Sequence, residues 1–142
     1  MQITRTGSAL WQGGLKDGKG SVSAQSGALN AYPYGFGSRF EGVKGTNPEE
    51  LIAAAHASCF AMALSMILGN AGFVAEQLDA KAAVTIAQVG DGFEITASQL
   101  TLRARIPGID QAKFAELTAM AKAGCPVSKV LKTAISLDAT LV

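Results

Sequence analysis

LIAAAHASCFAMALSMIL, residues 51–68, runs for eighteen residues without a charged side chain. Strong helix-start signals precede it, because Asn47 is a suitable N-cap and Pro48 stands at the first helical position. Gly69 and Asn70 follow it as a typical helix end. We therefore predict one long helix between these signals, around which the rest of the chain must pack.

The same stretch is just long enough to be tested as a membrane span. It is rich in alanine, however, it carries polar side chains at His56, Ser58 and Ser65, and no basic cluster flanks either end. A buried helix of a soluble protein is the better interpretation, and no membrane partner is expected. The N-terminal MQITRTGSALW lacks the apolar core of a signal peptide, so we expect a cytoplasmic protein.

Strand patterns lie on both sides of this helix. In the first forty residues alternation is visible in ITRTGSALWQG, SVSAQSGALN and YGFGSRFEG. After the helix, KAAVTIAQVG and FEITASQLTLRARI flank the hairpin turn Gly90-Asp91-Gly92. A second helix over residues 109–124, a short helix in CPVSKVLKT and a closing strand in AISLDATLV complete the chain. This order predicts an α+β fold in a single domain, residues 1–142.

The composition bears on the partners. Hydrophobic residues make up 49% of the chain and charged residues 16%, with a net charge of +1. So few charges leave little polar surface for a lone subunit, which indicates that a second subunit covers apolar surface. Twelve basic and eleven acidic residues are balanced and form no cluster, so nucleic acid is not an expected partner.

Two cysteines, Cys59 and Cys125, are the main candidates for chemistry. Cys59 stands among the alanines of the long helix, where a cysteine is usually inert core, so both interpretations stay open. Cys125 precedes Pro126 and is therefore a candidate N-cap of the short helix that follows. The positive end of that helix and Lys129, one turn on, favour its thiolate. A purely structural junction between two helices explains Cys125 equally well.

Helical phase separates the two glutamates at the start of the long helix. At about 100° per residue, Glu49 lies in the same half of the helix as Cys59, and Glu50 lies on the opposite side. Glu50 also has a local role in a capping box with Asn47, so Glu49 is the better functional candidate. Ten residues of straight helix cover about 15 Å. Glu49 therefore reaches Cys59 only if the helix bends or a second chain brings the groups together.

His56, the only histidine, lies three residues before Cys59 on the same helix face. With Cys59 and Cys125 it would supply three ligands of a zinc site, although the chain has no CxxC pair and a buried, hydrogen-bonded histidine is the commoner case. A non-catalytic redox sensor that uses the two thiols is a further alternative. Arg39, in GFGSRFEG, falls on a predicted strand, where an exposed arginine is the ordinary outcome.

RFEGVKGTNPEELIAAAHASCFAMALS (residues 39–65) and AGCPVSKVLK (residues 123–132) together closely resemble the OsmC/Ohr family of thiol-dependent peroxidases, and in particular its osmotically inducible OsmC branch. The resemblance extends over essentially the whole chain, and GTNPEEL, AAHASCF and GCPVS are its specific elements. It implies an OsmC-like fold, in which antiparallel sheets wrap around the central helices of an intertwined homodimer.

The resemblance also implies residue roles. Cys59 would be the peroxidatic thiol that reduces organic, and also inorganic, hydroperoxides, and Cys125 would resolve its sulfenic acid as a Cys59–Cys125 disulfide. Glu49 matches the family's glutamate after proline, and Arg39 matches the arginine of the OsmC branch, whereas the Ohr branch takes its arginine from an earlier position. An external dithiol, for which a lipoyl-type dithiol is a candidate, would recycle the enzyme. No metal or other cofactor is required.

This chemistry sets a geometric condition, because the α-carbons of two bridged cysteines lie about 4.4–6.8 Å apart. We also expect an apolar wall around the site, suited to hydroperoxides with a carbon tail. Its candidate members are Phe36, Phe60, Met62 and Met66. For the two methionines, packing in the core is an equally good explanation.

Overall fold

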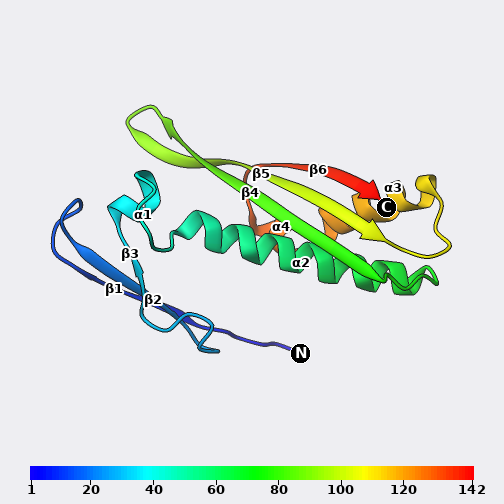
Figure 1. Cartoon of the computed structure of the whole chain (residues 1–142), viewed down its shortest axis with the longest axis horizontal. Helices are drawn as coiled ribbons and strands as arrows, with labels where there is room; N and C mark the ends of the chain where they lie inside the picture. Colours follow the sequence, from blue (N-terminus) through cyan, green and yellow to red (C-terminus); the bar gives the residue numbers. More distant parts are fainter. The chain divides into compact units, whose positions relative to one another are not determined.

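The structure, a computed structural model, describes residues 1–142. The chain forms two compact units, Met1–Pro48 and Glu49–Val142. Each unit contains its own three-stranded sheet, and the helices and strands follow the order expected of an α+β fold (Figure 1). The single domain expected over the whole chain stays a prediction.

The N-terminal unit is built on an antiparallel sheet in the order β1-β2-β3. Its strands are β1 (Gly7–Gln12), β2 (Lys19–Ala24) and β3 (Tyr32–Tyr34). Gly20 pairs with Trp11 on one side and Tyr34 on the other, and the two rings lie 5.5 Å apart. A side chain at Gly20 would collide with both rings, so the glycine allows them to pack across β2.

The predicted strand in YGFGSRFEG is wrong beyond Tyr34. A short helix, α1 (Phe36–Phe40), follows instead. The hydroxyl of Ser38 accepts a hydrogen bond from the Gly35 N–H at 2.9 Å and donates one to the Thr46 carbonyl at 2.8 Å. These local bonds compete with strand pairing and turn the backbone into a helix. Arg39 therefore lies on α1.

The predicted elements of the C-terminal unit are confirmed. The long helix α2 spans Pro48–Asn70 and is followed by the hairpin of β4 (Gln77–Val89) and β5 (Gly92–Arg105). The remaining elements are α3 (Gln111–Gly124), α4 (Pro126–Val130) and β6 (Ala134–Leu141).

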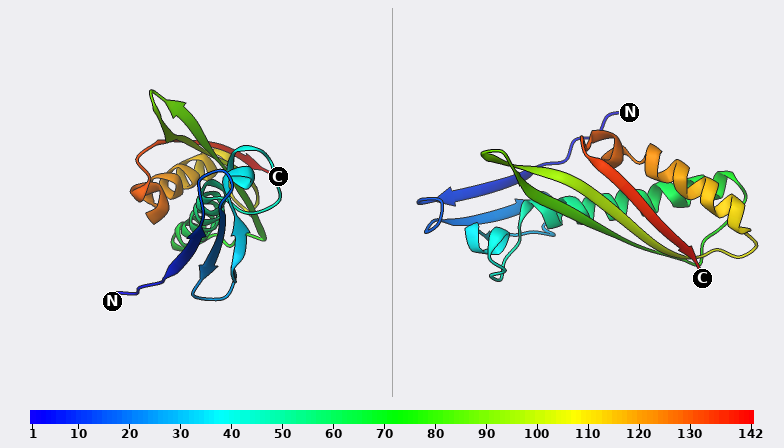
Figure 2. Two further views of the ribbon diagram at one scale, coloured as in Figure 1. Left: turned by 90° about the vertical axis from the view of Figure 1, so that its left-hand side faces the viewer. Right: turned by 90° about the horizontal axis from the view of Figure 1, so that it is seen from above.

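The expectation of purely antiparallel sheets is wrong at β6. The sheet order is β4-β5-β6, and β6 pairs with β5 in parallel. A parallel neighbour requires a crossover connection, and here α3 and α4 provide it. They lie on the same side of the sheet as α2 (Figure 2).

The core of this unit forms between α2 and one face of the sheet. Every fourth residue of α2 is buried, which is the spacing of a single helix face: His56, Phe60, Leu64 and Leu68. Every second residue of β5 is buried, which is the spacing of a single sheet face: Ser98, Leu100, Leu102 and Ala104. Both rows are apolar except at one end, where His56 and Ser98 stand.

The rest of α2 is less buried than the sequence predicts. By length and composition α2 could cross a membrane, since its most apolar window has a mean hydropathy of 2.0, and only 22% of that window is buried. Met62 is 77% exposed and Met66 is 63% exposed. The helix therefore has one face in the core and a second apolar face that nothing in its own unit covers.

Candidate functional site

The two cysteines occupy different kinds of position in the C-terminal unit. Cys59 is half-buried in the middle of α2, whereas Cys125 is fully buried at the junction of α3 and α4. The Cys125 N–H donates to the Ala121 carbonyl at 3.0 Å, which closes α3, and its carbonyl accepts from the Lys129 N–H at 3.1 Å, which opens α4. Pro126 fits the first position of α4 because its nitrogen has no hydrogen to donate.

The fold brings the two thiols together. Both cysteines are reduced, and their side chains are hydrogen-bonded to each other. The two thiols are thus neighbours in the fold although they are far apart in the sequence, and the disulfide between them stays a prediction.

The surroundings of the pair favour the negative charge on Cys125. Burial acts to raise the pKa of the Cys125 thiol, but hydrogen bonds from the Cys59 thiol, the Ser128 amide and hydroxyl and the Val127 amide outweigh it, so this pKa is lowered. Burial and the hydrogen bond to Cys125 raise the pKa of the Cys59 thiol. Cys125 is the N-cap of α4, as predicted, and the amides at the start of that helix help to lower its pKa, whereas the Lys129 side chain is exposed.

Cys125 has the lowered pKa, but Cys59 is the thiol that solvent can reach. Cys59 lines an apolar recess on the surface of the C-terminal unit, together with Met62, Ala63, Met66, Gly124 and Pro126. Cys125 is 0% exposed. A reagent from solution therefore meets the Cys59 sulfur and not that of Cys125.

The expected apolar wall is only partly correct. Met62 and Met66 line the recess, but Phe60 is fully buried in the core. Phe36 belongs to the N-terminal unit, where it contacts Phe40, and its place in the wall stays a prediction.

His56 is buried and hydrogen-bonded. Its Nδ1 lies 2.6 Å from the Ser98 hydroxyl oxygen and its Nε2 lies 2.8 Å from that of Ser128. Burial lowers the pKa of the imidazole, so the neutral ring is favoured. Both ring nitrogens are engaged by serines, and no group of three side chains suited to a metal ion is found. The sequence carried no signal that would have joined Ser98 to this site.

Glu49 lies outside the immediate surroundings of the thiols, and Arg39 belongs to the other unit. Glu49 is buried, at 7% exposed, and Glu50 is exposed, as the helical phase suggested. Because α2 is one unbroken helix, Glu49 and Cys59 of one chain stay about 15 Å apart along it. Arg39 belongs to the N-terminal unit, where its guanidinium lies 5.3 Å from the centre of the Phe40 ring. Its role at the thiol site stays a prediction.

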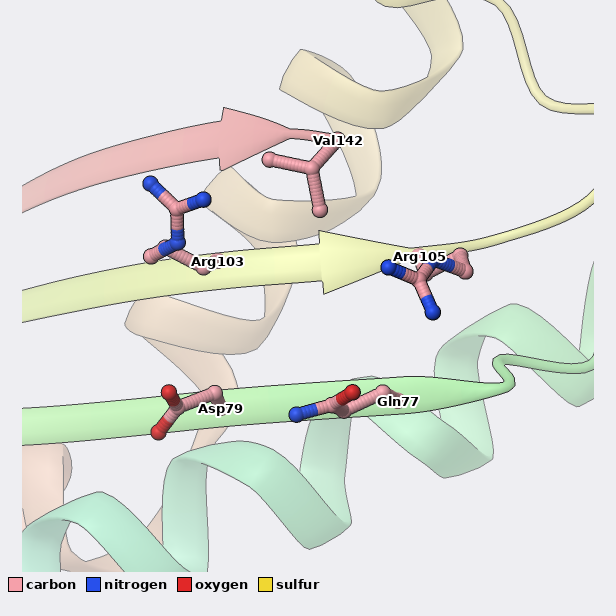
Figure 3. Close-up of a pocket in the computed structure, with 5 residues that line it drawn as sticks. All are labelled: Gln77, Asp79, Arg103, Arg105 and Val142. Atoms are coloured by element: carbon pink, nitrogen blue, oxygen red, sulfur yellow. The ribbon is translucent and has the colours of Figure 1, made fainter.

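A polar recess on the C-terminal unit is separate from this chemistry. Asp79 and Gln77 of β4 lie there beside Arg103 and Arg105 of β5, close to Val142 (Figure 3). These side chains stand on the exposed face of the sheet, because they alternate with the buried row that faces the helices. The recess contains neither cysteine, so the thiol pair is the better candidate.

Comparison with known proteins points to one group. A family model described as OsmC-like protein matches residues 41–140. Peroxiredoxin OsmC of Escherichia coli (strain K12) is 55% identical over 138 residues, which are 97% of this chain and 96% of that protein. An organic hydroperoxide resistance protein of Xanthomonas axonopodis pv. citri is 33% identical over 70% of this chain and 69% of its own. The crystal structure of such a protein from Elizabethkingia anophelis is 27% identical and has a TM-score of 0.71, over 99% of this chain and 98% of that one.

The contact between the thiols predicts rapid oxidation to an internal disulfide. Treatment with one equivalent of hydrogen peroxide should remove both thiol hydrogens, and peptide mapping of the intact chain should identify a Cys59–Cys125 bridge. The Cys125→Ser variant is the matched control and should keep the oxidised sulfur at Cys59 as a sulfenic acid. A disulfide formed only between chains would contradict the geometry.

Proposed function

The chain belongs to the family of OsmC-like proteins, and from this membership we propose that it is a thiol-dependent peroxidase in which Cys59 reduces the hydroperoxide and Cys125 resolves the product. The higher identity to peroxiredoxin OsmC than to the Xanthomonas protein agrees with the OsmC branch expected from the sequence. The observation that carries the proposal is the pair of contacting thiols, one open to solution and one buried.

The first step is attack of the Cys59 sulfur on the peroxide O–O bond, which yields a sulfenic acid and releases an alcohol or water. The thiolate is the nucleophile, and the pKa of a free cysteine is about 8.5, so the thiol needs activation near neutral pH. The C-terminal unit alone does not supply it, because burial and the bond to Cys125 raise the pKa of Cys59. A cation close to Cys59 would supply this activation, because a positive charge favours the thiolate.

We assign that cation to Arg39, oriented by Glu49. A guanidinium keeps its charge and binds a carboxylate with two parallel hydrogen bonds, so Glu49 would fix the direction of the Arg39 side chain. Since unbroken α2 holds Glu49 and Cys59 of one chain apart, the Glu49 that completes a site would be Glu49 of the partner subunit.

The assembly we propose is an intertwined homodimer. The uncovered apolar face of α2, with Met62 and Met66 exposed, supports it, because an apolar surface of this kind is stabilised by a second copy. The dimer would also bring the two halves of each site together.

The apolar lining of the Cys59 recess favours organic hydroperoxides, and hydrogen peroxide would also be accepted because it needs no apolar contact. An external dithiol, for which a lipoyl-type dithiol is a candidate, would reduce the Cys59–Cys125 disulfide by exchange. We place the enzyme in the cytoplasm as an antioxidant protein of the stress response. The scheme needs no metal, flavin or haem.

Substitution of Cys59 tests the reaction. Cys59→Ser should abolish turnover of cumene hydroperoxide with a dithiol reductant, because the attacking sulfur is lost. Cys125→Ser should consume about one equivalent of peroxide per chain and then stall, because no disulfide can form. Wild-type turnover in Cys59→Ser would refute the mechanism, and a single turnover by the wild type would favour a redox sensor over an enzyme.

Substitution of Arg39 and Glu49 tests the activation of Cys59. Arg39→Lys keeps the charge but loses the paired hydrogen bonds, and Glu49→Gln loses the charge of the orienting group. Both variants should lower the rate constant of the peroxide step by about 10-fold or more, and both should raise the pH at which Cys59 is alkylated at half its maximal rate. Glu50→Gln is the matched control, and an equal loss in that variant would show a general effect on α2.

Sedimentation velocity tests the homodimer. The wild type should sediment as a dimer at micromolar concentration, and Met62→Glu should shift it toward monomer because a charge would be buried at the interface. Gln111→Glu adds the same charge at the exposed start of α3 and should leave the dimer intact. A monomeric wild type would contradict the assembly.

A further inference from the structure

A chain of hydrogen bonds leads from the core to the Cys125 sulfur. The Ser98 hydroxyl oxygen lies 2.6 Å from Nδ1 of His56, and the Ser128 hydroxyl oxygen lies 2.8 Å from Nε2. Ser128 is the third residue of α4, whose N-cap is Cys125, and the bond of its hydroxyl to the Cys125 thiol is one cause of the lowered pKa of that thiol. Three elements, β5, α2 and α4, thus contribute one polar group each to a continuous path that ends on sulfur.

This path is placed where apolar packing would be expected. His56 continues the buried row of Phe60 and Leu64 on α2, and Ser98 continues the buried row of Leu100 on β5. Both His56 and Ser98 are 0% exposed. Two apolar side chains would fill the same place without the cost of removing polar groups from water. Stability alone therefore does not account for these residues, whereas their place on a path that leads through Ser128 to the Cys125 thiol does.

The protons of this path can be arranged in two ways with a neutral imidazole. In the first, Ser98 donates to Nδ1, the Nε2–H donates to Ser128, and the Ser128 hydroxyl donates to the Cys125 sulfur. In the second, the Cys125 thiol donates to Ser128, the Ser128 hydroxyl donates to Nε2, and the Nδ1–H donates to Ser98. Each hydroxyl has a single proton, so the directions are coupled along the whole path. The first arrangement fits a thiolate at Cys125 and the second fits a thiol.

We propose that His56 is a positioning residue for Cys125: with its Nε2–H bound to Ser128, the only hydroxyl proton of Ser128 must point at the Cys125 sulfur and stabilise it as a thiolate. This inference rests on the proposed peroxidase function and specifies which sulfur of the disulfide the reductant attacks. The reductant attacks the Cys59 sulfur, and Cys125 is the sulfur that leaves.

The same stabilised thiolate serves both halves of the cycle. In resolution, the Cys125 thiolate attacks the Cys59 sulfenic acid, the S–S bond forms, and the departing hydroxide takes up a proton to become water. In recycling, one thiolate of a dithiol attacks the Cys59 sulfur, the S–S bond breaks, and its electron pair stays on Cys125. The second thiol of the reductant then attacks the reductant's own sulfur in the mixed disulfide and releases Cys59, which takes up a proton. The oxidised reductant leaves as a cyclic disulfide. Two electrons pass from the dithiol to the protein.

Access supports the same direction. Cys59 lines the apolar recess, whereas Cys125 is fully buried, so an incoming dithiol reaches only the Cys59 sulfur. In thiol–disulfide exchange the sulfur with the lower pKa also leaves faster. The pKa of Cys125 is lowered by its hydrogen bonds and that of Cys59 is raised by burial, so both effects select Cys125 as the leaving group.

The other titratable groups around Cys125 are few. Cys59 on α2 faces it directly, and His56 acts through Ser128. From β5 the path receives only Ser98, which does not titrate in this range, and the Lys129 side chain on α4 is exposed. A pH-dependent change at His56 in the reduced C-terminal unit therefore reports on the two thiols or on the imidazole itself.

Because the chain has a single histidine, nitrogen NMR of protein labelled at histidine reads the tautomer without assignment. The reduced wild type should show the Nε2–H form where Cys125 is ionised, and the Nδ1–H form once the pH falls through the pKa of Cys125. The doubly protonated ring has its own signature and is distinguished from this switch. Cys125→Ala should lose the switch, and Ser58→Ala, beside Cys59 on α2, should keep it. A His56 tautomer that stays the same when Cys125 changes its ionisation would overturn the inference.

Reduction kinetics give a second test that needs no peroxide turnover. Starting from the purified disulfide form, Ser128→Ala should be reduced by dithiothreitol about three- to ten-fold more slowly than the wild type, because the leaving thiolate loses a hydrogen bond. Trapping of the mixed disulfide should find dithiothreitol on Cys59. An unchanged rate, or a mixed disulfide on Cys125, would overturn this inference and leave the peroxidase proposal intact. Failure of the Cys59→Ser test above would instead remove the peroxidase proposal.

Discussion

The contact between the Cys59 and Cys125 thiols is the constraint on which the rest of the C-terminal unit depends. Cys59 is fixed in the middle of a long helix, so Cys125 has to be brought to it. The parallel pairing of β5 and β6 forces the chain to cross the sheet, and α3 and α4 make that crossing. Pro126 cannot continue the hydrogen bonds of α3, so the break falls at Cys125, whose thiol is bonded to that of Cys59 on α2.

The two apolar faces of α2 differ in burial, and Cys59 lies between them. One face is a closely spaced apolar row against the sheet, and this row holds the helix rigid. The other face is apolar and uncovered by its own unit. A thiol on the border is anchored by the core, yet it stays open to solution through the recess with Met62 and Met66. The proposed mechanism needs both rigidity and access, because in it the Cys59 sulfur meets a peroxide and then Cys125.

Local signals in the sequence predicted most of the fold. Asn47-Pro48, Gly69-Asn70 and the Gly90-Asp91-Gly92 turn marked boundaries that the structure confirms, because such signals act on neighbouring residues. The strand predicted at Arg39 was wrong, because the hydrogen bonds of the Ser38 side chain outweigh the alternation of polar and apolar residues there. The parallel pairing of β6 depends on contacts far apart in the sequence, which no local pattern encodes.

The candidate site was predictable to a different degree. The spacing of Cys59 and Cys125 contains no information about distance in space, and only the resemblance to a family paired them. The helical phase did separate buried Glu49 from exposed Glu50, because that comparison involves a single helix. Ser98 and Ser128 were missed altogether: each serine is ordinary in its own segment, and His56 joins them only after the sheet and the helices have packed.

The distribution of charge between the two thiols also depends on groups that only the folded chain brings together. Amides and hydroxyls near Cys125 lower its pKa and burial raises that of Cys59, so the role proposed for Arg39 is to shift the charge toward Cys59.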